Sequence, residues 1–288
     1  MRTLHTLSAA AVSVVLTLGL AACSGGGPDG PPAAPTAAGS GSAPAASPSA
    51  PPAPNPAEVL KGSAAVMAKA GSAKFTVEGG LETGSGVMVW QAPQALQFDS
   101  RSGAPEGRYR VVDGATYLGV KESEKAAFKG RGWLKFDQKA ADDKVPGAGD
   151  GILVGGRFLA RNPVAELTAA AEGGQPALVG PDPVDGAPAV HYRAALEVAA
   201  LLNAQPELTA DLRGRVLTDL GKDGTGVVLD FWINDKGELL RLKETRPAAA
   251  VGSPSGRPTT FTYTGLGAGG VEAPAASDVT DMAKLLGG

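Results

Sequence analysis

The sequence contains very little cysteine and histidine: one cysteine, Cys23, and two histidines, His5 and His191. A lone cysteine cannot form a disulfide within the chain, and so few thiol and imidazole groups exclude a zinc site built from several Cys or His ligands. The G-x-S-x-G motif of serine hydrolases is absent as well. His191 lies mid-strand beside Tyr192 and Arg193, where we expect a solvated histidine rather than a general base. The sequence therefore predicts a protein that is not an enzyme and has neither a metal site nor a cofactor.

An excess of charge of either sign is also lacking. The 26 Lys and Arg residues nearly balance the 29 Asp and Glu residues, which gives a net charge of -3. The positive charges form no stripe that could follow a nucleic-acid backbone, and the C-terminus is not an acidic tail. Nucleic acid is therefore excluded as a partner.

Long hydrophobic runs are missing except for a short one at the N-terminus. After Arg2, residues 6–22 carry no charge and include several leucines and valines. This run is too short for a comfortable transmembrane helix and has the length of a signal-peptide core. The sequence therefore predicts a signal peptide over residues 1–22.

The four residues that close this run, Leu20-Ala21-Ala22-Cys23, resemble a bacterial lipobox. In that motif the cysteine thiol takes a diacylglyceryl group, and the cysteine becomes the first residue after cleavage. The resemblance implies a lipidated Cys23, an anchor in the membrane, and a position on the extracellular face of the cell membrane. The alternative is an ordinary secreted protein in which Cys23 is incidental.

Residues 23–57 form the next segment, and after Cys23 they consist almost entirely of Gly, Pro, Ala and Ser. Asp29 is the only charged residue in this segment. Such a composition cannot bury apolar surface, so we expect a disordered linker. The linker separates the lipidated Cys23 from one folded domain over residues 58–288.

Within that domain, helical and strand patterns alternate in blocks. A helix is predicted over 58–70, and short strands follow it, with a hairpin turn at Asp113-Gly114. Asn162-Pro163 predicts a helix start, and a second Asp-Gly turn lies at Asp185-Gly186. Residues 199–220 predict a helix that is interrupted at Pro206. Three more strands and a short helix over 278–286 complete the pattern.

This order predicts an α+β fold, in which a curved antiparallel β-sheet carries its helices on one side. Period-two alternation assigns a set of apolar side chains to the inward face of the sheet. The candidate set is Phe75, Val77, Tyr109, Val111, Tyr192, Leu196, Leu229, Phe231 and Ile233. We also place Leu240 and Leu242 on this face. An ordinary solid core would use the same residues, so the pattern alone does not distinguish a core from a cavity.

Several stretches together resemble the actinobacterial lipoproteins of the LppX/LprA/LprF/LprG type, which share a LolA-like fold. The matching stretches include Tyr109–Tyr117, Gly132–Lys135, Asn162-Pro163, Val184-Asp185-Gly186 with His191-Tyr192-Arg193, and Leu229–Gly237. The resemblance covers roughly residues 58–265. It departs from the group in a Pro/Gly/Ser-rich insertion over 247–258, before the last strand, which leaves the closure of that sheet edge open.

The resemblance implies a half-barrel sheet closed by helices, whose apolar interior binds the acyl chains of a lipid or lipoglycan. The expected function is then carriage or presentation of that lipid in the cell envelope. The alternative is a non-enzymatic sensor or interaction lipoprotein of the same fold with a filled core. The sequence identifies no protein partner for either function.

Overall fold

The computed structural model describes residues 54–79, 82–103, 107–137, 156–157, 159–205, 208–222, 224–246 and 258–286. The chain divides into two units, Met1–Pro51 and Pro52–Gly288, and all the described residues belong to the second. The predicted signal peptide, Cys23 and nearly all of the predicted linker lie outside the described residues. Among those residues, no helix is both long and apolar enough to cross a membrane.

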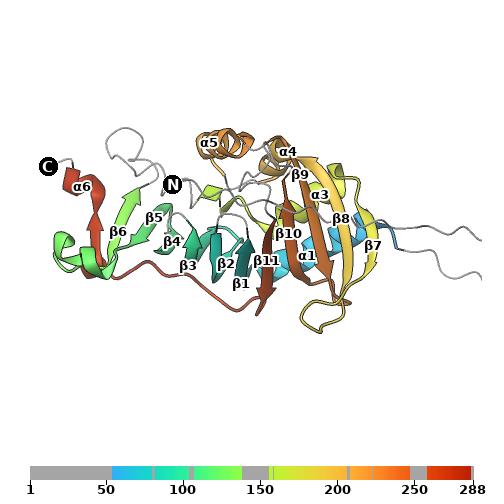
Figure 1. The fold of residues 1–288 in the computed structure, drawn as a ribbon, viewed down its shortest axis with the longest axis horizontal. Coiled ribbons are helices and arrows are strands. Elements are labelled where there is room, and N and C mark those ends of the chain that lie inside the picture. The colour runs from blue at the N-terminus through green and yellow to red at the C-terminus, as the bar shows by residue number, and fades with distance from the viewer. Residues whose placement is uncertain are drawn as a thin grey trace, which may run out of the picture. The chain divides into compact units, whose positions relative to one another are not determined.

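Twelve strands of the described residues form one sheet (Figure 1). The strands are β1 (Ser72–Gly79), β2 (Glu82–Val89), β3 (Ala95–Gly103), β4 (Gly107–Val112), β5 (Ala115–Gly119), β6 (Trp133–Asp137), β7 (Ala177–Pro181), β8 (Val190–Glu197), β9 (Gly226–Ile233), β10 (Leu239–Thr245), β11 (Thr259–Thr264) and β12 (Val279–Asp281). Their order is β12-β6-β5-β4-β3-β2-β1-β11-β10-β9-β8-β7. All pairs are antiparallel except β12 with β6.

Within the described ranges, the α-helices that accompany the sheet are α1 (Pro56–Ala70), α3 (Pro163–Gly173), α4 (Val198–Asn203), α5 (Ala210–Gly221) and α6 (Met282–Leu286). The 3-10 helices η1 (Glu122–Phe128) and η3 (Ala276–Asp278) lie in connections. Apolar residues of α1, α3, α4 and α5 share one core cluster with one face of the sheet, which we call the inner face. The predicted α+β class, with helices packed on one side of a curved antiparallel sheet, is confirmed.

The helix starts follow from local capping. The Asn55 side chain accepts a hydrogen bond from the Ala57 N–H, and Pro56 occupies the first turn, where its missing N–H costs nothing. The helix therefore begins two residues before the predicted boundary at 58. Asn162 caps α3 in the same way and accepts from the Val164 and Ala165 N–H groups.

Both Asp-Gly turns have the predicted geometry. Asp113 and Gly114 adopt φ values of 52° and 72° between β4 and β5, and Asp185 and Gly186 adopt 50° and 83°. Two consecutive positive φ values match the right-handed twist of the strands that a two-residue hairpin joins. These turns fix the register of the strands that flank them.

One strand register differs from the sequence-based expectation. Leu240 was placed on the inner face with Leu242, but it packs on the opposite face beside Trp232. The cause is a β-bulge between Leu239 and Arg241, which inserts one residue against β9. Leu239 therefore takes the inward position, and it is fully buried in the main core.

The insertion at 247–258, of which residues 247–257 lie outside the described residues, does not open a sheet edge. It connects β10 to β11, and these two strands pair directly, while β11 also pairs with β1. The edge strands are β7 and β12 instead. The sequence left open whether the sheet closes at this point. It does, because β11 pairs with a strand on each side and lies in the middle of the sheet.

The segment between β11 and β12, residues 265–278, crosses the outer face of the sheet, and we call it the strap. Figure 1 shows it running from β11 along the row of strands to β12. The Gly267 N–H donates to the Ser72 carbonyl at 2.8 Å, and the Asp278 carboxylate accepts from the Gly132 N–H at 2.6 Å. Val271 of the strap packs on a small outer cluster that contains Tyr117 and Trp133. The strap therefore connects the middle of the sheet to its β6 edge.

Candidate functional site: the inner face of the sheet

The structure brings all nine predicted inward residues into one apolar cluster. Each of them is at most 9% exposed, and Leu229 and Phe231 are fully buried. The face assignment from period-two alternation was therefore correct for the whole set.

Strand pairing arranges the inner face in rows across the sheet. One row runs through Tyr192, Phe231, Leu242, Phe261 and Val77 on five adjacent strands. Side chains directly opposite each other on neighbouring strands lie about 5 Å apart at their Cβ atoms, so each row is a continuous apolar band.

A series of aromatic rings in mutual contact starts at Phe261 of this row and continues across the neighbouring strands, and we call it the aromatic ladder. The Phe261 and Phe75 ring centroids lie 6.1 Å apart, and those of Phe75 and Phe98 lie 5.8 Å apart with nearly parallel planes. The Phe98 and Tyr109 rings follow at 6.4 Å. The ladder therefore spans β11 to β4 with three phenylalanines and one tyrosine. The predicted set lacked Phe98 and Phe261, although Phe98 alternates with Gln97 and Asp99 and could have been found by the same period.

Helices α1, α3 and α4 lie over one half of this face, and α5 packs on the same core cluster through Leu212 and Val216. Figure 1 shows α1, α3 and α4 along the half that contains β8 to β11, and α3 and α4 contact β8. At this contact a Cβ added to Gly174 would lie 2.9 Å from the Ala194 Cβ, so helix and strand approach closely. A hollow of about 470 Å³ remains at the strand ends beside Leu196 and Val227. The β8 half is therefore closely packed up to its rim.

A polar cluster interrupts the apolar interior beneath α3. Glu166 is fully buried, and neither carboxylate oxygen has a hydrogen-bond partner among the described residues. The buried hydroxyl of Tyr263 also lacks one there. Nearby, Glu244 forms ion pairs with Arg161 and Arg246, the second at 2.5 Å. Because buried polar groups are normally hydrogen-bonded, Glu166 and Tyr263 are unusual members of this interior.

Burial also changes the protonation of this cluster. Desolvation raises the pKa of Glu166 to about 8, against the opposing charge of Arg161. Burial raises the pKa of Tyr263 well above its ordinary value, and the negative charge of Glu166 is a second, smaller cause of this shift. At neutral pH Glu166 is therefore mostly a neutral carboxylic acid, which can both donate and accept a hydrogen bond.

His191 lies on the outer face, and the expectation that it is solvated was wrong. It is 8% exposed, and its ring stacks on Trp232 with centroids 4.3 Å apart. Its Nε2 atom lies 2.7 Å from Asp230 Oδ1, which also accepts from Arg193 Nε at 2.7 Å. Burial arises because Trp232 on the adjacent strand covers the ring, a contact that one strand's periodicity cannot show.

The three tryptophans are buried, and each packs in one of the three hydrophobic clusters. Trp90, Trp133 and Trp232 are between 5% and 7% exposed. Within the described residues, no group of three His, Cys, Asp or Glu side chains is placed to hold a metal ion.

No protein-family profile matches this chain, but individual known proteins resemble it in sequence or in structure. The chain is 29% identical over 194 residues to an uncharacterized 31.2 kDa protein encoded in the rplA-rplJ intergenic region of Streptomyces griseus. This match covers 67% of the chain and 61% of that relative, so the chain spans less than two thirds of the relative's length.

Similar solved structures include two mycobacterial proteins. LprF from Mycobacterium bovis has 14% sequence identity and a TM-score of 0.48, with coverage of 78% of this chain and 98% of that one. The Mycobacterium tuberculosis lipoprotein LppX has 11% identity and a TM-score of 0.43, with coverage of 72% of this chain and 93% of that one. Both proteins belong to the lipoprotein group that the sequence motifs resemble.

Proposed function

We propose that this chain is a membrane-anchored lipoprotein that binds the acyl chains of a lipid or lipoglycan against the inner face of its sheet, for carriage or presentation in the cell envelope. The observation that carries the proposal is the aromatic ladder of Phe261, Phe75, Phe98 and Tyr109. Together with the apolar row, with which it shares Phe261, it forms a face that suits hydrocarbon and offers few polar contacts.

The binding that such a surface provides is non-covalent and mainly non-directional. Each methylene group removed from water contributes about 0.8 kcal/mol, so two acyl chains supply ample affinity without specific hydrogen bonds.

The half of the inner face between β1 and β5 is the part we assign to the ligand. Val111 and Tyr109 lie there on β4, and Phe98 lies on β3. The described helices α1, α3 and α4 lie along the other half, where Gly174 approaches Ala194 closely. An acyl chain over the ladder would therefore lie on strands that α1, α3 and α4 do not cover, in the core cluster to which α5 contributes Leu212 and Val216.

The membrane anchor in this proposal is lipidated Cys23, and its support is the Leu20-Ala21-Ala22-Cys23 motif behind an apolar run. One acyl chain gives only marginal membrane binding, whereas the two chains of a diacylglyceryl group anchor stably. We place the domain on the extracellular face of the cell membrane, with residues 24–53 as its tether.

A second candidate function is a sensor or interaction lipoprotein with a filled core. The observation that favours it is the burial of the whole predicted set to 9% exposure or less. In that case the same residues stabilise the fold and bind no lipid.

Lipid extraction separates the two functions. Residues 54–288 are purified from a bacterial host without detergent, and the extract is analysed by mass spectrometry. The proposal expects a lipid that co-purifies in an amount comparable to the protein and that reloads after delipidation. A protein without lipid that also fails to take up lipid from vesicles would favour the filled core.

A further inference from the structure

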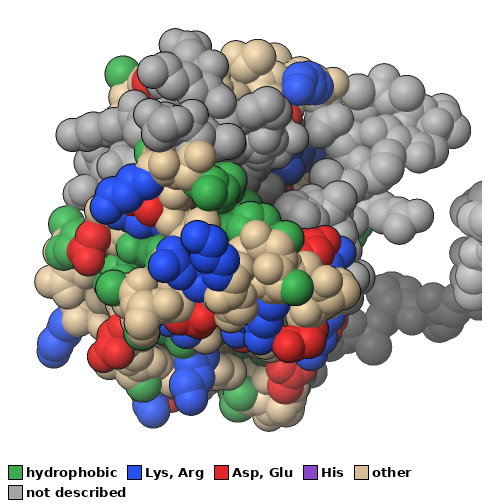
Figure 2. All heavy atoms as spheres, turned by 90° about the vertical axis from the view of Figure 1, so that its left-hand side faces the viewer, with side chains coloured by type: hydrophobic (Ala, Val, Ile, Leu, Met, Phe, Trp, Pro, Cys, Tyr) green, Lys and Arg blue, Asp and Glu red, His purple; other side chains and the backbone are tan. Residues whose placement is uncertain are grey.

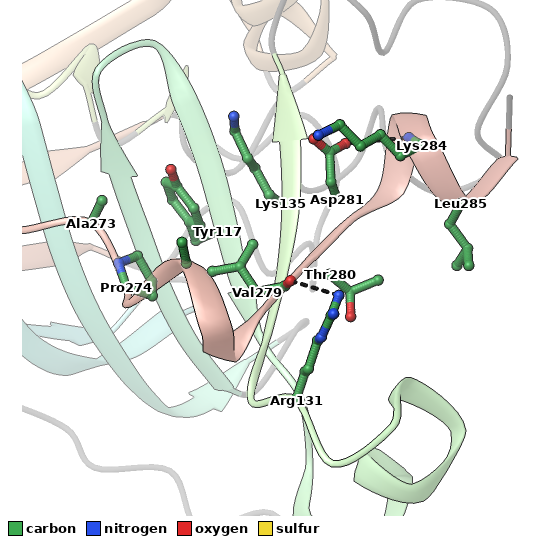
Figure 3. Close-up of a pocket in the computed structure, with 11 residues that line it drawn as sticks. Tyr117, Arg131, Lys135, Ala273, Pro274, Val279, Thr280, Asp281, Lys284 and Leu285 are labelled. Carbon is green, nitrogen blue, oxygen red and sulfur yellow. Dashed lines mark hydrogen bonds between the residues drawn. The ribbon is translucent and has the colours of Figure 1, made fainter. Parts of the chain in front are cut away.

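A separate hollow lies on the outer face, at the β6 edge of the sheet (Figure 3). Its volume is about 680 Å³, and the strap, β12 and α6 surround it. This volume lies within the range of small-molecule sites. It is on the opposite face from the aromatic ladder, so it is not part of the proposed acyl-chain site.

Three adjacent strands build the floor of this hollow. Tyr117 of β5 is paired with Lys135 of β6, and Lys135 is paired with Asp281 of β12. Figure 3 shows the Tyr117 ring and the Lys135 side chain side by side, extending in the same direction. Arg131 forms another wall and is held there because its Nη1 donates to the Val279 carbonyl at 3.0 Å.

Positive charge dominates the lining. Arg131, Lys135 and Lys284 are the cations, and Asp281 is the only carboxylate among the lining residues. The Asp281 side chain already accepts from the N–H groups of Ala283 and Lys284, at 3.1 and 3.3 Å. The chain as a whole has a net charge of -3, so this is a local excess of positive charge. Such a concave cationic site concentrates anions.

Apolar groups lie beside these cations. Leu285 of α6 is 56% exposed, and Val279 and Pro274 line the same hollow. Figure 2, which views this end of the sheet, shows Lys and Arg side chains interspersed with apolar and acidic ones. The chemistry that fits both features is an anion attached to an apolar group.

We propose that this hollow binds the phosphate of an amphiphilic phosphate ester between Lys135 and Lys284, with Arg131 as a further cation of the lining and Leu285 beside the apolar part. Lysine binds phosphate as a point charge. The ester can be the head group of a membrane lipid or a soluble molecule, since both present the same group. Binding here depends on charge and is weakened by salt.

The test uses residues 54–288 and the double variant Lys135→Gln with Lys284→Gln. The control is Lys69→Gln with Lys236→Gln, two exposed lysines outside the hollow. Each protein is mixed with vesicles of phosphatidylcholine alone, with vesicles that also contain phosphatidylglycerol, and with soluble glycerol phosphate. Co-sedimentation and NMR titration measure the affinity. Two lysines near an anionic surface together account for about a tenfold change or more.

We expect binding to phosphatidylglycerol vesicles that falls at least about tenfold in the Lys135/Lys284 variant and is unchanged in the control variant. Binding of glycerol phosphate without vesicle binding would assign the same site to a soluble ester. The proposal is overturned if the native domain binds neither phosphate compound, if both double variants lose affinity equally, or if a short polyglutamate peptide binds as tightly as glycerol phosphate. Because acyl-chain uptake on the inner face is measured separately, failure of one proposal leaves the other intact.

Discussion

The rings of Phe75 and Phe98 stack 5.8 Å apart on strands that are not neighbours, and Gly86 of the strand between them is paired with both residues. A side chain at position 86 would occupy this space, since an added Cβ would lie 3.0 Å from the Phe75 ring and 2.0 Å from the Gln97 carbonyl oxygen. The aromatic ladder therefore depends on a glycine at this position.

Gly86→Ala should destabilise the domain by about 1–3 kcal/mol, because the backbone and both rings must shift. Urea denaturation of residues 54–288 measures this change. The matched control is Gly214→Ala in α5, where an added Cβ meets nothing within 4 Å. That change should be neutral or stabilising, by up to about 1 kcal/mol, because alanine favours helix. Equal effects of the two substitutions would contradict the role of Gly86.

Glu166 should make the domain less stable as the pH rises. Its folded pKa of about 8 lies above the ordinary value of 4.5, so between these values the folded state holds a proton that the unfolded state has lost. The stabilisation is fully present below the ordinary value and is lost as the pH rises towards 8. Each unit of difference corresponds to about 1.4 kcal/mol, so the total effect is a few kcal/mol.

Denaturation of native domain and Glu166→Gln between pH 5 and pH 9 tests this prediction. The variant should show a much shallower decrease of stability with pH and should be the more stable protein at the alkaline end. Glu197→Gln, a change at an exposed position of β8, is the control and should keep the native slope. If the stability of Glu166→Gln falls with pH as steeply as that of the native domain, Glu166 is not the cause of the pH dependence.

Cys23→Ala should prevent anchoring of the full chain. Without the thiol, the diacylglyceryl group has no attachment site, so the precursor is either not processed or released into the medium. Cell fractionation with a carbonate wash, followed by immunoblotting, distinguishes these outcomes. A cleaved variant that stays with the membrane would show that the anchor is not lipidation of Cys23.

Local sequence signals correctly predicted the two Asp-Gly turns, the helix start at Asn162-Pro163 and the face of the nine candidate inward residues. Asp113-Gly114 and Asn162-Pro163 are local patterns, and each is determined by a few neighbouring residues. Alternation along one strand was sufficient to place Tyr192, Leu229 and Phe231 in the core, because the buried face of a strand has a period of two.

Features that depend on distant residues were not predictable in this way. Leu240 changes face because a bulge in β10 adds one residue opposite β9, and no turn or proline signals the bulge. His191 is buried because Trp232, on another strand, stacks on it. A glutamate in a helix is expected to be exposed because its side chain is normally charged, yet the packing of α3 buries Glu166 completely. The strap is a non-repetitive segment whose place follows only from its contacts with the sheet.

Val111 and Val112 provide the most direct test of the acyl-chain site, because these neighbours lie on opposite faces of β4. Val111 is in the inner cluster, and Val112 packs in the small outer cluster with Trp133. The test measures how residues 54–288, after delipidation, bind the hydrocarbon probe diphenylhexatriene. The free energy of unfolding is measured on the same proteins. These are the native domain and the variants Val111→Trp and Val112→Trp.

The account predicts that the native domain binds the probe saturably. Val111→Trp should abolish this binding with little loss of stability, because the indole enters space that an acyl chain would take. Val112→Trp should keep the probe and lose about 1–3 kcal/mol by overpacking the outer cluster. Absence of probe binding in the native domain, with equal destabilisation by both substitutions, would contradict the account and indicate a solid core.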